Sequence, residues 1–129
     1  KLLVKKKKLR NSSSVVFTAS ISGYNNVAPA NGIYGTSKSA LSTYMKYAAL
    51  ELAGKGIRCN AVQPGRINTP LISNRLLSEE DVTKDIEQYP MKRYGKPEEV
   101  AHAIIYLLSD ASAWVTGTNL VIDGGRSLK

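Results

Sequence analysis

The sequence is poor in cysteine and histidine and has no long hydrophobic run, and each shortage excludes a class of protein. The only cysteine, Cys59, has no second cysteine for a disulfide, and its apolar surroundings IRCNAVQ predict a small buried side chain rather than a reactive thiol. The only histidine, His102, is expected on a helix surface, and no metal site is predicted. No run approaches the roughly 20 apolar residues of a membrane-spanning helix, so no membrane insertion is predicted.

Acidic residues are missing from the first ten positions, which hold six of the eighteen basic side chains. The other 119 residues carry twelve basic and ten acidic side chains, so the net charge of +8 falls to +2 without this segment. Clustered basic residues can bind the phosphates of nucleic acid. Because the body of the chain is nearly neutral, we expect the basic run to be a solvated helix end, with nucleic-acid binding as the less favoured alternative.

The chain of 129 residues is long enough for one domain, residues 1–129, and its 43% hydrophobic content is typical of a globular protein. It starts with Lys and has no cap residue ahead of Leu2 and Leu3. We therefore expect it to begin inside a helix that ends near residue 8, with an N-terminal part missing. The segment KLLVKKKKLRNSSS has neither the apolar stretch nor the cleavage site of a secretory signal, so a cytoplasmic setting is predicted.

Short apolar runs alternate with helical patterns along the rest of the chain. Strands are expected at residues 15–18, 57–62 and 119–122, with Gln63, Pro64 and Gly65 ending the second strand. Helices are expected at residues 33–53, 71–77, from 79 onward after the cap residue Ser78, and 97–109. The inward face of the last helix is expected to hold Val100, Ala103, Ile104, Leu107 and Leu108. This alternation predicts an α/β fold, a three-stranded parallel sheet with helices packed on its faces.

Three polar side chains stand where such a sheet binds ligands. Ser20 follows the first strand, and Tyr34 and Lys38 are one turn apart at the start of the long helix. A tyrosine has an ordinary pKa of about 10, and an ammonium within roughly 4–6 Å lowers it by about 1–3 units. Such a phenol can exchange a proton with an alcohol or alkoxide, while a serine orients the same oxygen. Taken alone, the pair Tyr34 and Lys38 is a weak signal, and a structural role is the favoured explanation, with a buried tyrosine, an exposed lysine and a turn-forming serine.

The ordered combination of segments carries more information than any pair of residues. The segments are TASISG, YGTSK, NAVQPGRINTP, RYGKPEEVAHAIIYLLSD and WVTGTNLVIDGG. From about Leu2 to Gly125 the chain resembles the C-terminal half of a short-chain dehydrogenase/reductase. The resemblance implies a partial Rossmann-like sheet. It also implies that Tyr34 is the general acid/base, that Ser20 positions the substrate carbonyl, and that Lys38 lowers the tyrosine pKa and binds the nicotinamide ribose.

The resemblance extends to the cofactor and substrate regions. It implies that Pro64, Gly65, Ile67 and Thr69 line the nicotinamide and pyrophosphate, together with Tyr34 and Lys38. Residues 71–94 would be the substrate loop. The glycine-rich phosphate turn TGxxxGxG, the ribose-recognising position, the NNAG strand and the catalytic asparagine of the family have no counterpart here. The dinucleotide-binding half is therefore expected to lie outside this chain, and the cofactor is NAD or NADP without a choice between them.

The predicted function is an NAD(P)-dependent oxidoreductase that reduces a carbonyl group or oxidises an alcohol at a Ser-Tyr-Lys proton-transfer site. The segments KPEEVAHAIIYLLSD and DGG look most like those of 3-oxoacyl-thioester reductases and of sugar or polyol dehydrogenases. The resemblance also implies a homo-oligomer packed through the helix before the first strand, the helix that carries Tyr34 and the last strand. The alternative, from a different class, is a truncated non-catalytic remnant or self-association module that lacks cofactor binding.

Overall fold

Three parallel strands form the centre of the computed structural model, which describes residues 6, 9, 12–24, 26–73 and 78–129. The strands are β1 (Ser14–Thr18), β2 (Arg58–Pro64) and β3 (Asn119–Ile122), side by side in the order β1-β2-β3. Phe17 pairs with Ala61, and Val62 pairs with Leu120. The predicted three-stranded parallel sheet is confirmed. The helix end expected at residues 1–8 lies outside the described residues, apart from Lys6.

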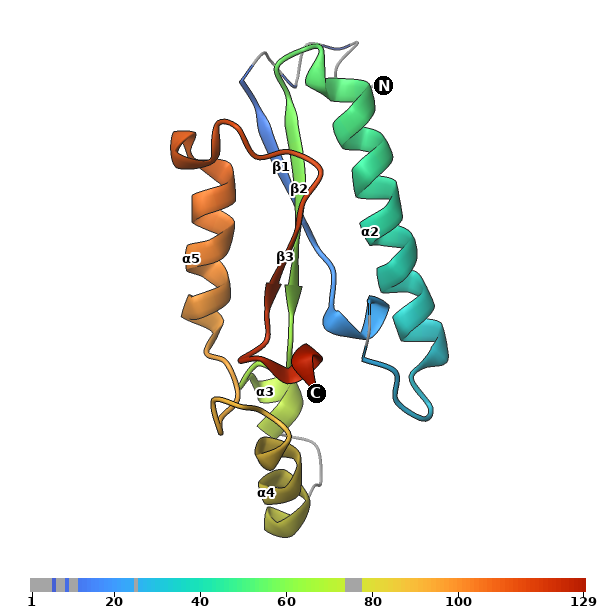
Figure 1. The fold of residues 1–129 in the computed structure, drawn as a ribbon, viewed down its shortest axis with the longest axis vertical. Helices are drawn as coiled ribbons and strands as arrows, with labels where there is room; N and C mark the ends of the chain where they lie inside the picture. Colours follow the sequence, from blue (N-terminus) through green and yellow to red (C-terminus); the bar gives the residue numbers. More distant parts are fainter. Residues whose placement is uncertain (1–5, 7–8, 10–11, 25, 74–77) are drawn as a thin grey trace.

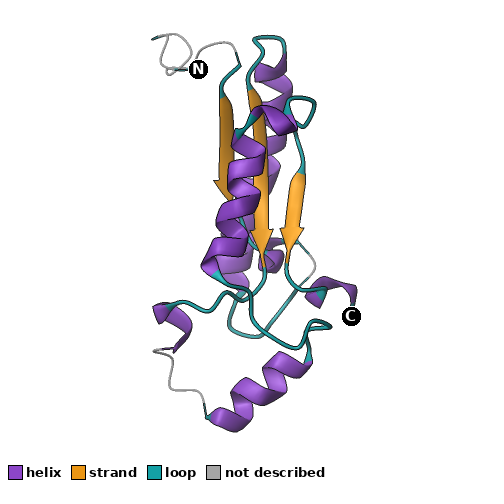
Figure 2. Cartoon of the chain, turned by 90° about the vertical axis from the view of Figure 1, so that its left-hand side faces the viewer, coloured by secondary structure: helices purple, strands orange, loops and turns teal. Residues whose placement is uncertain are grey.

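Two long helices cover the sheet, one on each face (Figure 1). They are α2 (Gly32–Ala53), between β1 and β2, and α5 (Pro97–Leu108), before β3. Parallel neighbours need a long crossover connection, which these helices supply. Figure 2 shows the resulting layers, with the strand arrows all pointing to the same end. Both helices confirm the predicted pattern to within one residue at each end.

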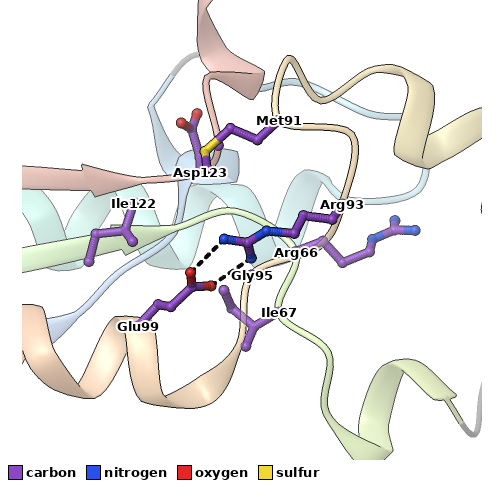
Figure 3. Close-up of a pocket in the computed structure, with 9 residues that line it drawn as sticks. Arg66, Ile67, Met91, Arg93, Gly95, Glu99, Ile122 and Asp123 are labelled. Carbon is purple, nitrogen blue, oxygen red and sulfur yellow. Dashed lines mark hydrogen bonds and ion pairs between the residues drawn. The ribbon is translucent and has the colours of Figure 1, made fainter.

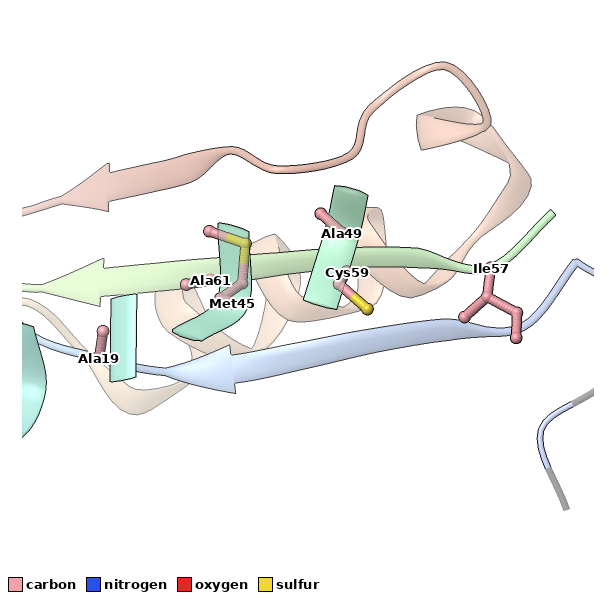
Figure 4. Packing of buried hydrophobic residues seen from close by; sticks show 6 residues of the cluster. All are labelled: Ala19, Met45, Ala49, Ile57, Cys59 and Ala61. Atoms are coloured by element: carbon pink, nitrogen blue, oxygen red, sulfur yellow. The ribbon is translucent and has the colours of Figure 1, made fainter. Parts of the chain in front are cut away.

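The core lies between α2 and the sheet and is built largely from small side chains (Figure 4). Its fully buried members are Ala19, Met45, Ala49, Ile57, Cys59 and Ala61. Alanines on both elements let the helix approach the strands closely, and Met45 fills the remaining space. Cys59 is 1% exposed, as predicted, and burial raises the pKa of its thiol. It is therefore a packing residue.

Two details of the sheet and α5 differ from the sequence prediction. Gln63 and Pro64 belong to β2 instead of ending it. The backbone N–H groups of Ala61 and Gly65 donate to the β3 side of the sheet. Because backbone N–H groups alternate in direction along a strand, position 64 faces β1, which ends before this point. The missing N–H of proline therefore costs no hydrogen bond between strands. The expectation that Leu108 faces inward is wrong, since it is 49% exposed. Leu107 faces the sheet at this last turn, and adjacent helix residues point about 100° apart.

The remaining elements lie mainly beyond the carboxyl ends of the strands. They are the short helices η1 (Ile21–Gly23), α3 (Pro70–Ser73), α4 (Glu79–Glu87), η2 (Asp110–Ser112) and η3 (Arg126–Leu128). Helix α4 begins as predicted, because the Ser78 side chain accepts a hydrogen bond from the Asp81 backbone N–H at 3.1 Å. Within the described part of the chain, no helix has the length and hydropathy needed to cross a membrane.

Candidate active site

Ser20 lies two residues beyond the end of β1 and caps the helix η1. The residue is 8% exposed, and its Oγ accepts a hydrogen bond from the Ser22 backbone N–H at 3.2 Å. That bond uses a lone pair of the hydroxyl oxygen, so the hydroxyl hydrogen can still be donated to a ligand. Ser20 thus stands at the edge of the sheet where ligands bind in open α/β folds.

Two glycines hold the serine turn against the first turns of α2. A Cβ at Gly23 would lie only 2.6 Å from the backbone nitrogen of Ser39, and one at Gly35 only 2.8 Å from the carbonyl oxygen of Ser22. The Ser39 hydroxyl also donates to the Gly23 carbonyl at 2.7 Å. No larger residue fits either contact without a shift of backbone. The glycines therefore bring the turn that carries Ser20 next to the helix turn that carries Tyr34.

Lys38 joins the next turn of the same helix to the end of β1. Its Nζ donates to the backbone carbonyl of Thr18 at 3.0 Å and lies 5.7 Å from the centre of the Tyr34 ring. Tyr34 itself is 46% exposed, so its phenol is accessible from solvent. The structure thus brings Ser20, Tyr34 and Lys38 together at the carboxyl end of β1, linked through Thr18 and the serine turn.

The residues predicted to line the cofactor follow the neighbouring strand. Pro64 is the last residue of β2, and Gly65 packs so closely on the next strand end that a Cβ would lie 3.0 Å from the Cα of Asp123. Ile67 forms an isolated parallel bridge with Gly95. Thr69 immediately precedes α3. All four lie at the same edge as the Ser20 group, one strand further along the sheet.

A pocket opens beside this second group (Figure 3). It is lined by Arg66, Ile67, Met91, Arg93, Gly95, Glu99, Ile122, Asp123 and Gly124. Of the predicted site residues it contains only Ile67. The pocket lies by the ends of β2 and β3, whereas Tyr34 and Lys38 come from α2 on the other face of the sheet. The predicted residues therefore share an edge, and of them Ile67 alone lines this pocket.

An ion pair crosses the pocket from its loop to α5. Two guanidinium nitrogens of Arg93 contact the carboxylate oxygens of Glu99 at 2.6 and 2.8 Å (Figure 3). The Lys96 backbone N–H donates to the same carboxylate at 2.7 Å. The Arg93 guanidinium and this N–H lower the pKa of Glu99 to about 2. Glu99 is therefore ionised at neutral pH, where it anchors the start of α5.

Sequence reasoning missed a second polar cluster around Arg66. Its guanidinium contacts Asp85 of α4 at 2.7 Å, and the Tyr94 hydroxyl donates to the same Asp85 oxygen at 2.7 Å. Burial and the Asp85 carboxylate raise the pKa of Tyr94, which keeps this hydroxyl protonated as a donor. Arg66 and Asp85 are nineteen residues apart in the sequence, and no helix or strand spacing predicts a contact at that separation. Among the described residues, no cluster of three or more histidine, cysteine or carboxylate side chains could hold a metal ion.

Comparison with known proteins decides the family. A family model described as enoyl-(acyl carrier protein) reductase matches residues 3–127. A solved short-chain type dehydrogenase/reductase from Mycobacterium ulcerans superposes with a TM-score of 0.84 at 37% sequence identity, over 90% of this chain and 42% of that one. The chain belongs to the short-chain dehydrogenase/reductase family. The resemblance drawn from the motifs and the partial Rossmann-like sheet are both confirmed.

Curated short-chain dehydrogenases and reductases of different substrates are similar to this chain. It is 42% identical over 118 residues to a 3-oxoacyl-(acyl-carrier-protein) reductase of Thermotoga maritima, which covers 92% of this chain and 46% of that protein. It is 41% identical over 116 residues to cyclohexanol dehydrogenase of an Acinetobacter strain, which covers 90% of this chain and 44% of that protein. The chain thus spans about half the length of the curated relatives it matches, and it corresponds to the C-terminal part of such a protein.

Proposed function

We propose that this chain supplies the proton-transfer side of a cytoplasmic, NAD- or NADP-dependent oxidoreductase that interconverts a carbonyl compound and an alcohol. Tyr34 is the general acid/base, Ser20 holds the substrate oxygen, and Lys38 supports the tyrosine. The observation that carries this proposal is the position of Lys38, whose ammonium bonds the end of β1 and lies beside the Tyr34 ring. The close packing of the serine turn on α2 supports it.

The proposed proton transfer follows from the groups at this edge. In the reducing direction, the exposed phenol of Tyr34 gives its proton to the oxygen of the carbonyl group as negative charge develops there. The Ser20 hydroxyl donates a hydrogen bond to the same oxygen and fixes its position. The positive charge of Lys38 stabilises the phenolate that remains. Oxidation of an alcohol uses the same groups in reverse.

The residues present fit a nicotinamide cofactor. An ammonium has three donors, and the bond to Thr18 uses one, so Lys38 can also hold a ribose hydroxyl. Pro64, Gly65, Ile67 and Thr69 would line the cofactor along the end of β2. The cofactor supplies the hydride that the side chains of this chain cannot provide. The substrate classes favoured by the relatives are 3-oxoacyl thioesters and small cyclic or sugar alcohols.

The test uses the full-length protein expressed from its own gene, with Tyr34→Phe compared with Tyr47→Phe. Both tyrosines belong to α2 and both are exposed, so the second variant controls for loss of a phenol from this helix. NAD(P)H absorbance is followed with 3-oxoacyl thioesters, cyclohexanol and sugars. Tyr34→Phe should lower kcat by about 10²–10⁴-fold while Tyr47→Phe leaves it unchanged. Equal turnover in both variants would overturn the proposal.

A second candidate, self-association, is supported by the outer face of α2. Ile33, Tyr44, Tyr47 and Leu50 are between 62% and 92% exposed on this helix. Exposed apolar side chains of this size on one helix are typical of an interface between protein chains. Sedimentation of the protein with Leu50→Glu tests the candidate. A fall to the mass of one chain supports self-association through α2, and an unchanged mass contradicts it.

A further inference from the structure

Helix α4 lies beyond the carboxyl ends of the strands (Figure 1) but buries none of its nine residues. Val82, Asp85 and Ile86 are only partly buried on this helix, so it gains less from the hydrophobic effect than a helix with fully buried side chains. Short helices of this length are also marginal in water on their own. The position of α4 therefore depends on specific polar contacts in addition to this partial burial.

Asp85 provides such a contact. Its Oδ2 forms an ion pair with the Arg66 guanidinium and accepts a hydrogen bond from the Tyr94 hydroxyl, each at 2.7 Å. The Arg66 guanidinium also lies 5.6 Å from the centre of the Tyr94 ring, within the range of a cation–π contact. One carboxylate on α4 is thus held by two groups that belong to the loops on either side of it.

Arg66 is itself fixed to the sheet. It follows Gly65 at the end of β2, and its backbone N–H donates to the hydroxyl of Tyr89 at 3.2 Å. Tyr89 is only 4% exposed and packs edge-to-face on Tyr94, with ring centres 5.8 Å apart. The guanidinium therefore projects from a rigid base, while the carboxylate that it binds belongs to a helix that has no fully buried side chain.

We propose that Arg66 is a positioning residue that fixes α4 beyond the carboxyl ends of the strands through Asp85 and thereby sets the affinity for substrate. The proposal rests on the proposed function, because α4 belongs to the segment that the family resemblance identifies as the substrate loop. The side chains of Arg66 and Asp85 are each 28% exposed. At this partial burial the ion pair is screened less than one on the open surface, yet water can still reach it.

The proposal differs from a general stabilising role in what it predicts. Arg66 is outside the Ser20, Tyr34 and Lys38 group, so its loss should leave the chemical step intact. A displaced α4 would weaken substrate binding, which raises KM while kcat changes little. A residue that merely stabilised the fold would lower the amount of active protein and leave KM unchanged.

Hydrogen exchange followed by mass spectrometry tests the structural half without any need for turnover. Arg66→Gln is compared with Arg93→Gln, which removes the other arginine–carboxylate pair of the same pocket but no contact of α4. The amides of residues 82–88 should exchange about tenfold faster in Arg66→Gln, since the ion pair that holds α4 is lost, and at the wild-type rate in Arg93→Gln. Unchanged exchange in Arg66→Gln would overturn the proposal.

A second pair of variants tests the Arg66–Asp85 ion pair by changing α4 instead of Arg66, in case Arg66→Gln does not fold. Asp85→Asn removes the charge that Arg66 binds, and Glu80→Gln makes the same change on an exposed residue of the same helix. Asp85→Asn should raise KM about tenfold with kcat within twofold, and Glu80→Gln should change neither. The exchanged pair Arg66→Asp with Asp85→Arg should restore part of the lost affinity.

The two levels of the proposal fail in distinguishable ways. If the wild-type protein shows no nicotinamide-linked turnover, the proposed function is wrong, and the exchange rates still decide whether Arg66 fixes α4. If turnover is present but Asp85→Asn lowers kcat and leaves KM unchanged, the positioning role is wrong and the proposed function stands.

Discussion

The ammonium nitrogen of Lys38 lies 3.0 Å from the backbone carbonyl oxygen of Thr18, twenty residues earlier in the chain. This bond ties the second turn of α2 to the last residue of β1. It fixes the side chain in the position from which its charge reaches the Tyr34 ring at 5.7 Å. A single side chain thus joins the strand end that carries Ser20 to the helix turn that carries the phenol.

Replacement of this lysine should affect activity far more than stability. Lys38→Met keeps the aliphatic part of the side chain but removes the bond to Thr18 and the charge beside Tyr34. We expect a loss of about 0.5–1.5 kcal/mol in the free energy of unfolding, typical of one hydrogen bond. Turnover should fall by at least about a hundredfold, because the proton donor loses its supporting charge. Lys46→Met, an exposed residue of the same helix, is the control for both urea denaturation and kinetics.

The two glycines at the serine turn should be intolerant of a methyl group. In Gly23→Ala the new Cβ would meet the Ser39 backbone nitrogen at 2.6 Å, so η1 must move away from α2. We expect about 1–3 kcal/mol of destabilisation in urea denaturation, together with reduced turnover. Gly32→Ala is the matched control, because its Cβ would have open space within 4 Å at the start of the same helix. Equal stability of the two variants would contradict the packing argument.

Much of the fold could be predicted because its signals are local. The apolar runs of β1 and β3 and the period of α2 are each contained in one stretch of sequence. Long-range contacts gave no such signal, which is why the bond between Arg66 and Asp85 was missed. The inclusion of Pro64 in β2 depends on where β1 ends, and this too is a relation between segments. The grouping of Ser20, Tyr34 and Lys38 at one edge followed from the order of elements, and their catalytic roles remain predictions.

The Arg93–Glu99 pair should make stability depend on pH in the acid range. The pKa of Glu99 is lowered from 4.5 to about 2, chiefly by Arg93. The folded state therefore favours the ionised carboxylate more than the unfolded state does. This contribution is present above pH 4.5 and is lost as the pH falls from about 4.5 to 2.

Glu99→Gln reveals this contribution when its unfolding midpoint is compared with that of the wild type from pH 2 to 7. The wild type should be the more stable protein at pH 5–7, and the difference should vanish near pH 2. Arg93→Gln should lose the larger part of the same pH dependence, because Arg93 is the main cause of the lowered pKa. A smaller part should remain, because the Lys96 backbone N–H is still bonded to Glu99. A difference that is constant across the whole range would contradict the assignment.

Ser42 and Gln63 form a buried polar pair beneath α2 whose loss should be strongly non-additive. Gln63 is fully buried, its Nε2 donates to the Ser42 hydroxyl at 3.2 Å, and its Oε1 has no partner among the described residues. Ser42→Ala would leave the whole amide without a partner, at a cost of about 1–3 kcal/mol in the free energy of unfolding. Gln63→Met removes the amide at nearly constant volume, so the same Ser42→Ala change should then cost less than about 0.5 kcal/mol. A urea double-mutant cycle measures both values. If Ser42→Ala costs the same in the two backgrounds, the serine contributes packing alone and the hydrogen bond adds nothing to the free energy of unfolding.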